Sequence, residues 1–180
     1  MKYIRSNQKG GTFFFTVVTY KRRRILCNEA NIRRFYDIIA HVKKNHPFDV
    51  DAFVILHDHM HFIWTMPEND CDFSKRWMLI KKGFSMQCYI KDNYILTESM
   101  TTKREKAVWQ RRFWEHQIRD ERDFATHVDY IHYNPVKHGY VKRPRDWKWS
   151  TFKRYVKNGI YDVNWGSMEE IKFDDDVGNE

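Results

Sequence analysis

The chain has 180 residues, of which 42% are apolar and 17% aromatic, so the composition indicates a folded domain rather than a disordered chain. Lysine and arginine outnumber aspartate and glutamate by 32 to 24, and the net charge of +8 favours a polyanionic partner such as nucleic acid. The three cysteines form no CxxC pair and no long apolar stretch occurs, which argues against a disulfide framework, a signal peptide and a membrane span.

The first half of the chain predicts a strand, a helix and two further strands. Residues 10–20 follow a double glycine and are β-branched and aromatic, which is typical of a strand. Residues 28–46 have apolar side chains at helical spacing and stop before Pro47. The segments DVDAFVIL and HMHFIWTM then predict two strands, with His57 and Asp58 near the turn between them.

The second half predicts a helix, an extended segment and a last helix. Asp72 or Ser74 can cap a helix whose apolar stripe runs from Phe73 to Cys88. AVWQRRFWEHQI is extended, and a helix over residues 120–133 ends against Pro135. This order predicts an α+β fold, with a ferredoxin-like antiparallel sheet, helices packed on one face and one extra helix. We expect a single domain over residues 1–180, with a flexible acidic tail from about residue 167.

The stretch HDHMHF, residues 57–62, concentrates three of the nine histidines of the chain. Alternate residues of a strand face opposite ways, so His59 and His61 share the face without the obvious apolar core. Two imidazoles at this spacing can hold a divalent ion, although an HxH pair alone is a weak motif. The spacing also matches the histidine-triad nucleotide hydrolases, but Asp58 stands at an apolar position of that pattern and His57 leaves the alternation if it lies in the turn.

The last predicted helix carries a second cluster of polar residues. On a helical wheel, one flank holds Asp123, His127, Tyr130 and Asn134. Tyrosine is a weak nucleophile at neutral pH, and a metal helps it by binding the phosphate that it attacks. Two histidines and one amide oxygen suit Mg²⁺ or Mn²⁺ better than Zn²⁺. A polar flank is also usual on an amphipathic helix, so the wheel alone does not assign a site.

Taken together, these motifs resemble a known family. His59-Met60-His61 followed by a helical tyrosine resembles the HUH single-tyrosine transposases. GGTFFFT, HMHFIWTMPEND, DFSKRWMLIKKGFS, RRFWEH, HVDYIHYNPVKHG and DWKWSTFKRYV resemble the REP-associated tyrosine transposases, over about residues 3–166. The resemblance implies the HUH nuclease fold, metal ligands His59, His61 and Asn134, and the nucleophile Tyr130. Asp123 and His127 are possible supporting residues behind these ligands. His57 stands where the family commonly has proline, which puts the geometry of the turn in doubt.

Basic clusters and glycines form the predicted DNA contacts, because cations bind phosphate and glycine permits close approach to bases. The predicted DNA-binding residues are Arg5, Gly10, Gly11, Arg22, Arg23, Arg24, Arg111, Arg112, Lys142 and Arg143. Solvated surface charge is the competing interpretation for each of the cations.

The resemblance implies a metal-dependent nuclease and strand transferase that acts on single-stranded DNA hairpins, the repeated extragenic palindromes, through a 5′-phosphotyrosine. The cofactor would be Mg²⁺ or Mn²⁺. The protein would act as a monomer or weak homodimer, and it would lie in the cytoplasm, at the nucleoid. Two alternatives remain: a histidine-triad nucleotide hydrolase, and a hairpin-binding protein without catalysis.

Overall fold

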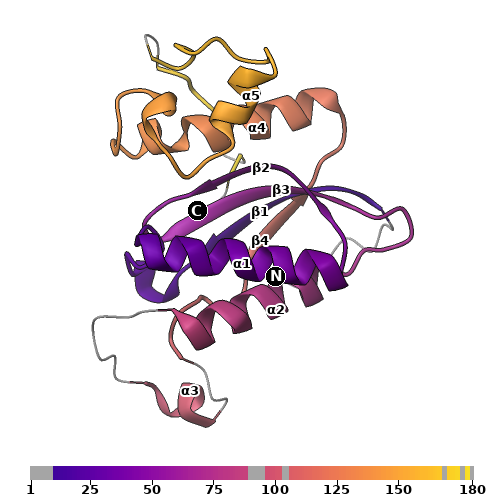
Figure 1. Cartoon of the computed structure of the whole chain (residues 1–180), viewed down its shortest axis with the longest axis vertical. Coiled ribbons are helices and arrows are strands. Elements are labelled where there is room, and N and C mark those ends of the chain that lie inside the picture. The colour runs from indigo at the N-terminus through magenta and orange to yellow at the C-terminus, as the bar shows by residue number, and fades with distance from the viewer. Residues whose placement is uncertain (1–9, 89–95, 103–105, 168–169, 175–176, 179–180) are drawn as a thin grey trace.

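The computed structural model describes residues 10–88, 96–102, 106–167, 170–174 and 177–178. Its strands are β1 (Gly11–Val18), β2 (Asp49–Ile55), β3 (His59–Met66) and β4 (Trp114–Gln117). Its α-helices are α1 (Glu29–Asn45), α2 (Phe73–Gln87), α3 (Glu98–Thr102), α4 (Glu121–Lys137) and α5 (Phe152–Lys157). Two short 3-10 helices, η1 (Tyr20–Arg22) and η2 (Pro144–Asp146), complete the elements (Figure 1).

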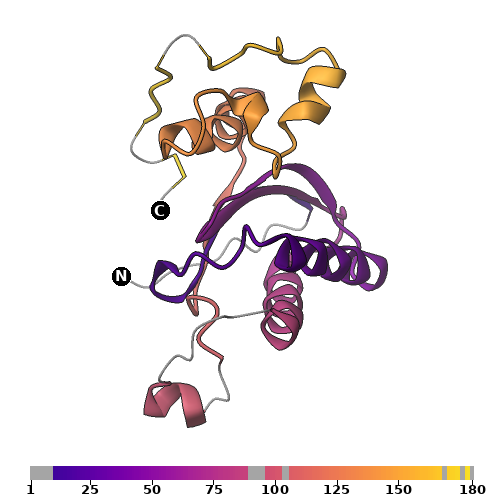
Figure 2. The ribbon, with the colours of Figure 1, turned by 60° about the vertical axis from the view of Figure 1, so that its left-hand side comes forward.

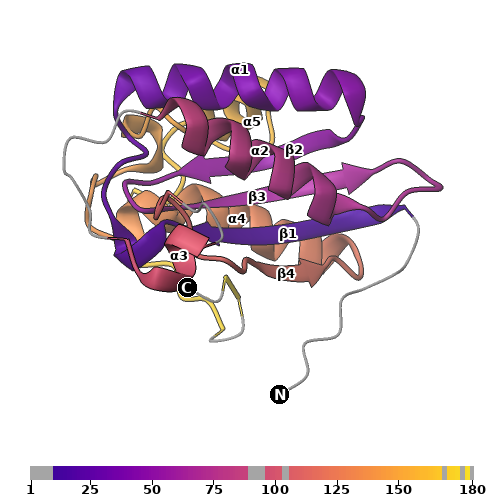
Figure 3. The same ribbon diagram turned by 90° about the horizontal axis from the view of Figure 1, so that it is seen from below.

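The four strands form one antiparallel sheet in the order β2-β3-β1-β4, which confirms the predicted ferredoxin-like arrangement (Figure 3). β1 and β3 are the central pair, with Val18 opposite His59 and Gly11 opposite Met66. Thr16 lies opposite His61, and this register places a hydroxyl beside the second histidine of the HxH pair. The pairing of β1 with β3 therefore determines which side chains surround the histidines.

Helices cover both faces of the sheet (Figures 1 and 2). On the α1 and α2 face, Met60, Phe62 and Trp64 join the larger apolar cluster, as the alternation along β3 predicted. On the other face, Phe14, Ile63 and Val128 belong to a second cluster formed with α4. The sheet face that carries His59 and His61 is therefore covered by a second apolar core, and both residues have 0% exposure.

The prediction that the last helix ends before Pro135 was wrong, because α4 continues through Pro135 to Lys137. A proline has no N–H to donate to the carbonyl four residues back, so α4 gives up one intrahelical hydrogen bond at this position. The chain beyond it is still held, since the N–H groups of His138 and Tyr140 donate to the carbonyls of Asn134 and Pro135. Asn134 consequently lies inside the helix, four residues from Tyr130.

Side-chain caps begin the three long helices, and they explain where these helices start. Asn28 accepts from the backbone of Ala30 and Asn31, Asp72 from Lys75, and Asp120 from Asp123. Asp72 is therefore the cap of α2, and Ser74 lies inside that helix. No helix among the described residues has the length and apolar character needed to cross a membrane.

Candidate metal and tyrosine site

His59 and His61 begin β3, and each ring is oriented through its Nδ1 atom. The His59 Nδ1 lies 2.7 Å from Oδ1 of Asp58, and the His61 Nδ1 lies 3.0 Å from Oγ1 of Thr16. Metal-binding histidines are commonly held in this way, by a carboxylate or hydroxyl on the nitrogen that does not bind the ion. Since both Nδ1 atoms have these partners, Nε2 is the ligating nitrogen that each ring offers, and the ring centroids lie 5.2 Å apart.

Asp58 supports His59 as an anion. Burial opposes its charge, but the hydrogen bond from His59 and the nearby guanidinium of Arg22 outweigh burial and lower the pKa of Asp58. Arg22 Nη1 lies 3.6 Å from Asp58 Oδ2. The residue that breaks the histidine-triad pattern is thus the partner that orients the first histidine of the HxH pair.

One strip of α4 faces these histidines. The Tyr130 ring lies 5.3 Å from the His61 ring, and the His138 ring, just beyond the end of α4, lies 4.9 Å from the His59 ring. Asn134 lies midway between Tyr130 and His138 on the same strip and has 0% exposure. The strip therefore places the predicted amide ligand and the predicted nucleophile over β3.

Tyr130 is 1% exposed, and its hydroxyl contacts Lys137 and Gly178. Lys137 Nζ donates to the hydroxyl at 2.9 Å, and the hydroxyl donates to the Gly178 carbonyl at 3.2 Å. Phe173 packs edge-on against the ring at 5.3 Å. Described residues of the acidic C-terminal segment thus cover the tyrosine that the sequence singled out.

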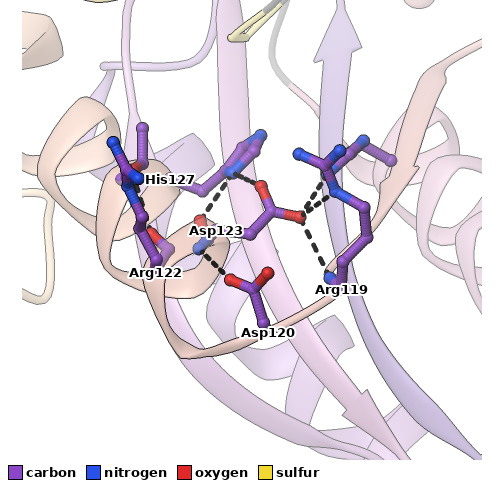
Figure 4. A network of polar contacts seen from close by, with 7 residues as sticks. Arg119, Asp120, Arg122, Asp123 and His127 are labelled. Atoms are coloured by element: carbon purple, nitrogen blue, oxygen red, sulfur yellow. Dashed lines mark hydrogen bonds and ion pairs between the residues drawn. The ribbon is translucent and has the colours of Figure 1, made fainter.

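A second group on the same face consists of His116, Asp123 and His127, and it could hold a metal ion because its ligand atoms lie within 4.8 Å of one another. Its carboxylate is already engaged, as Figure 4 shows in part: Arg119 donates to Asp123 Oδ2, and His127 Nδ1 lies 3.1 Å from Oδ1. Burial opposes the charge of Asp123, but hydrogen bonds from Arg119 and His116 outweigh it and lower its pKa well below the ordinary value.

This group is separated from the HxH histidines by one aromatic ring. Phe14 lies 4.8 Å from His127, 5.4 Å from His61 and 6.2 Å from Tyr130, measured between ring centroids. The His116 and His127 rings are stacked at 4.7 Å with an interplanar angle of 14°. Asp123 and His127 therefore contact β4 and Phe14, and these contacts fasten the first half of α4 to the sheet.

The predicted DNA contacts are dispersed over the molecule. Arg22 and Arg24 are exposed beside the histidine end of β3, where Arg24 lies over the Tyr140 ring. Gly10 and Gly11 have φ values of +70° and +91° and lie at the far end of β1, roughly 23 Å from Val18 at about 3.3 Å per residue.

The remaining predicted cations lie elsewhere. Arg23 donates to the Ala107 carbonyl, Arg111 to Ser99, and Arg143 pairs with Asp146. Arg112 and Lys142 are exposed, and Arg5 lies outside the described residues.

His57 does not share the alternation of His59 and His61. It precedes β3, and its ring packs against Tyr140 at 4.9 Å and Trp147 at 5.6 Å. The structure therefore does not place His57, His59 and His61 in one row, which a histidine-triad hydrolase needs.

Among the residues that touch the site, sequence reasoning missed Lys137, Thr16 and His138. Lys137 is seven positions after Tyr130, two helical turns away, so the helical wheel could have found it. Thr16 and His138 had no such signal, because strand register and the path of the chain after α4 bring them to the histidines.

Comparison with known proteins identifies the family of this chain. The IS200-like transposase family matches residues 11–134, a range that includes both histidines, the tyrosine and Asn134. The REP-associated tyrosine transposase of Escherichia coli (strain K12) is 46% identical over 165 residues, 91% of this chain and 90% of the relative. A protein of Haemophilus influenzae named as the same kind of transposase is 40% identical over 175 residues, 97% of this chain and 98% of the relative.

A solved structure of a REP-associated tyrosine transposase bound to a REP hairpin is similar in both sequence and fold. It has 41% identity and a TM-score of 0.80, covering 100% of this chain and 98% of the other. These matches confirm the family that the motifs predicted. The chain belongs to the REP-associated tyrosine transposases, within the IS200-like family of tyrosine DNA endonucleases.

Proposed function

We propose that this protein cuts and joins single-stranded DNA at palindromic hairpins of the REP type, through a covalent 5′-phosphotyrosine on Tyr130. The observation that carries the proposal is the position of Tyr130, whose ring lies 5.3 Å from His61 with Lys137 Nζ at its hydroxyl. The similar structure bound to a REP hairpin supports this class of substrate. Such a substrate places the protein in the cytoplasm, at the bacterial nucleoid.

The chemistry follows from the groups around the tyrosine. The Tyr130 oxygen attacks the phosphorus, its proton leaves to water, the bond to the 3′ oxygen breaks, and that oxygen takes up a proton. The Lys137 ammonium, 2.9 Å from the hydroxyl, stabilises negative charge as it develops on the phenol oxygen. The phosphotyrosine ester conserves the energy of the broken bond, so a second 3′-hydroxyl reseals the strand without ATP.

His59, His61 and Asn134 fit a divalent ion, Mg²⁺ or Mn²⁺, because two oriented imidazoles of β3 and one amide of the facing strip of α4 are all buried. When bound, such an ion neutralises the phosphate and aligns it for in-line attack. We assign the catalytic metal to this set rather than to His116, Asp123 and His127. In that second group the carboxylate is engaged by Arg119, and the His116 and His127 rings are stacked almost parallel to each other.

One chain contains the whole constellation, since α4 packs on its own sheet and contributes the tyrosine beside its own histidines. This arrangement supports action as a monomer, with at most weak homodimerisation. Sedimentation of the protein with and without hairpin DNA measures the oligomeric state.

The test of the proposed function is incubation with single-stranded DNA that carries palindromic hairpins, with Mn²⁺ or Mg²⁺ and then with EDTA. A denaturing gel measures both cut strands and a covalent protein–DNA adduct. We expect metal-dependent cutting and an adduct that Tyr130→Phe abolishes. Tyr133→Phe is the matched control, because Tyr133 is a buried tyrosine on the same helix that packs against Trp165. Cutting by Tyr130→Phe at the wild-type rate contradicts the assignment.

Two further variants separate the two candidate metal groups. His61→Ala should abolish cutting, while His116→Ala should leave metal-dependent cutting in place, even if it lowers stability. The opposite pattern would move the catalytic metal to the His116 group. Tight hairpin binding with no cutting in any metal would favour a binding protein without catalysis.

A further inference from the structure

A row of aromatic side chains leads away from the metal-binding histidines, and we call it the aromatic track. Its members are His138, Tyr140, His57 and Trp147. The His138 ring lies 4.9 Å from His59, and the Tyr140 ring stacks on His138 at 5.7 Å with an interplanar angle of 17°. Trp147 continues the row, stacked on Tyr140 at 5.6 Å and 24°. The row is therefore continuous from the candidate catalytic centre outward.

The residues of the aromatic track differ in burial: one is part of the core, and the other three are more exposed. Trp147 is 8% exposed and its indole N–H donates to the Ile55 carbonyl, so it belongs to the core and holds the row in place. His57, His138 and Tyr140 are only half-buried. His57 packs edge-on against Tyr140 at 4.9 Å, which fixes the tyrosine ring from the side.

Cations flank the open side of the track. The Arg24 guanidinium lies 5.6 Å from the centre of the Tyr140 ring, and Arg24 is exposed. Arg22, also exposed, is anchored to Asp58 beside His59. Two arginines and a row of half-exposed rings reproduce the combination used to bind single-stranded nucleic acid, in which bases stack on aromatic rings and cations follow the phosphates.

We propose that Tyr140 is a stacking site for an unpaired base of the DNA strand next to the phosphodiester that Tyr130 attacks. In this arrangement Arg24 moves from the Tyr140 ring to a phosphate, and the base takes its place on the ring. The proposal rests on the proposed function, since the unpaired nucleotide is part of the same substrate. It differs from readout of the hairpin stem, because stacking needs a base but no base pair.

Binding measurements in EDTA test the site without any chemistry. The probes are a palindromic DNA stem-loop with a blunt end and the same stem-loop with a single-stranded extension of about six nucleotides. Tyr140→Ala should weaken binding of the extended probe roughly 5- to 150-fold and leave the blunt probe unchanged, since a base on an aromatic ring contributes about 1–3 kcal/mol. Tyr140→Phe should retain wild-type affinity, because stacking does not use the hydroxyl.

The matched control is Tyr36→Ala. Tyr36 is a tyrosine of α1 with 38% exposure that packs on Phe53, on the opposite face of the sheet. This variant should bind both probes as the wild type does. An extension of abasic nucleotides should bind more weakly to the wild type, and Tyr140→Ala should then have no further effect.

A second measurement needs no variant that might unfold. 2-Aminopurine placed in the extension should lose fluorescence when the wild-type protein binds, because stacking quenches it. Equal loss of affinity for both probes in Tyr140→Ala, or unquenched 2-aminopurine in the bound complex, would overturn the stacking site while hairpin recognition stands. Failure to bind either stem-loop would overturn the proposed substrate together with this site.

Discussion

The C-terminal segment over Tyr130 gives a prediction about activity. Gly178 accepts the hydrogen bond of the Tyr130 hydroxyl, Phe173 packs on the ring, and Val177 lies against the same apolar cluster. DNA that reaches the hydroxyl must displace these residues. We therefore expect that removing residues 172–180 raises both the affinity for hairpin DNA and the rate of cutting. Because these contacts are largely apolar, they should hold the segment over Tyr130 in addition to any attraction between the acidic tail and a basic site.

The magnitude follows from the contacts that are lost. One hydrogen bond contributes about 1 kcal/mol, an aromatic pair about 1 kcal/mol, and a half-buried valine about 1 kcal/mol. Ordering the segment offsets part of this gain, which leaves about 2 kcal/mol in favour of the covered state. Only molecules in which Tyr130 is uncovered can react with DNA, and about 2 kcal/mol keeps this fraction at about one in 30. Removing the segment should therefore increase the single-turnover rate of cutting about 30-fold.

A point variant tests the same contact without changing length or charge. A Cβ at Gly178 would lie 2.0 Å from Cε1 of Tyr130, so Gly178→Ala must move the segment off the ring. Gly159→Ala is the control, because Gly159 also has a positive φ, +73°, but has open space around it. The assay is the single-turnover rate of adduct formation. If the truncation leaves that rate unchanged, or Gly178→Ala behaves like Gly159→Ala, the segment does not restrict access to Tyr130.

Two further predictions concern the support of the site and the pH dependence of stability. Thr16→Val removes the hydroxyl at His61 Nδ1 and should raise the Mn²⁺ concentration needed for half-maximal cutting about 10- to 100-fold. Thr12→Val, at the other end of the same strand, should leave this concentration unchanged. Burial lowers the pKa of His132 to about 3, so the residue is protonated near pH 6.5 in the unfolded chain but stays neutral at that pH in the folded protein. The free energy of unfolding, measured in urea, should therefore fall by about 2 kcal/mol between pH 7.5 and 5 because of His132, and His132→Gln should not show this loss. An equal loss in the variant would contradict the assignment of the pH dependence to His132.

The two elements that carry the candidate site were predictable because their periodicity is local. Alternation along β3 was enough to separate His59 and His61 from Met60 and Phe62, and the structure confirms this division. Helical geometry likewise placed Asn134 one turn from Tyr130, on the strip that faces β3. Each inference needed only the repeat of one element, and tertiary packing did not alter that repeat.

Other parts of the site depend on contacts between distant segments, and no local pattern contains them. Thr16 reaches His61 only through the register of β1 against β3, a separation of 45 residues. Gly178 reaches Tyr130 across 48 residues. The helix end at Pro135 was mispredicted for a different reason: proline removes only one hydrogen bond, and those donated by the N–H groups of His138 and Tyr140 hold the turn beyond it.

The sheet separates stability from chemistry, and this separation explains how such a site can be buried. Taking imidazole and amide groups out of water costs free energy, and His59, His61 and Asn134 all have 0% exposure. The face that carries them gains less apolar packing than the opposite face, where Phe62, Trp64 and the helices α1 and α2 form the larger cluster. The α1 and α2 face therefore supplies most of the folding free energy, which leaves the α4 face free to hold polar groups at fixed positions. Rigid support from one side of the sheet is what lets the histidines keep their spacing on the other.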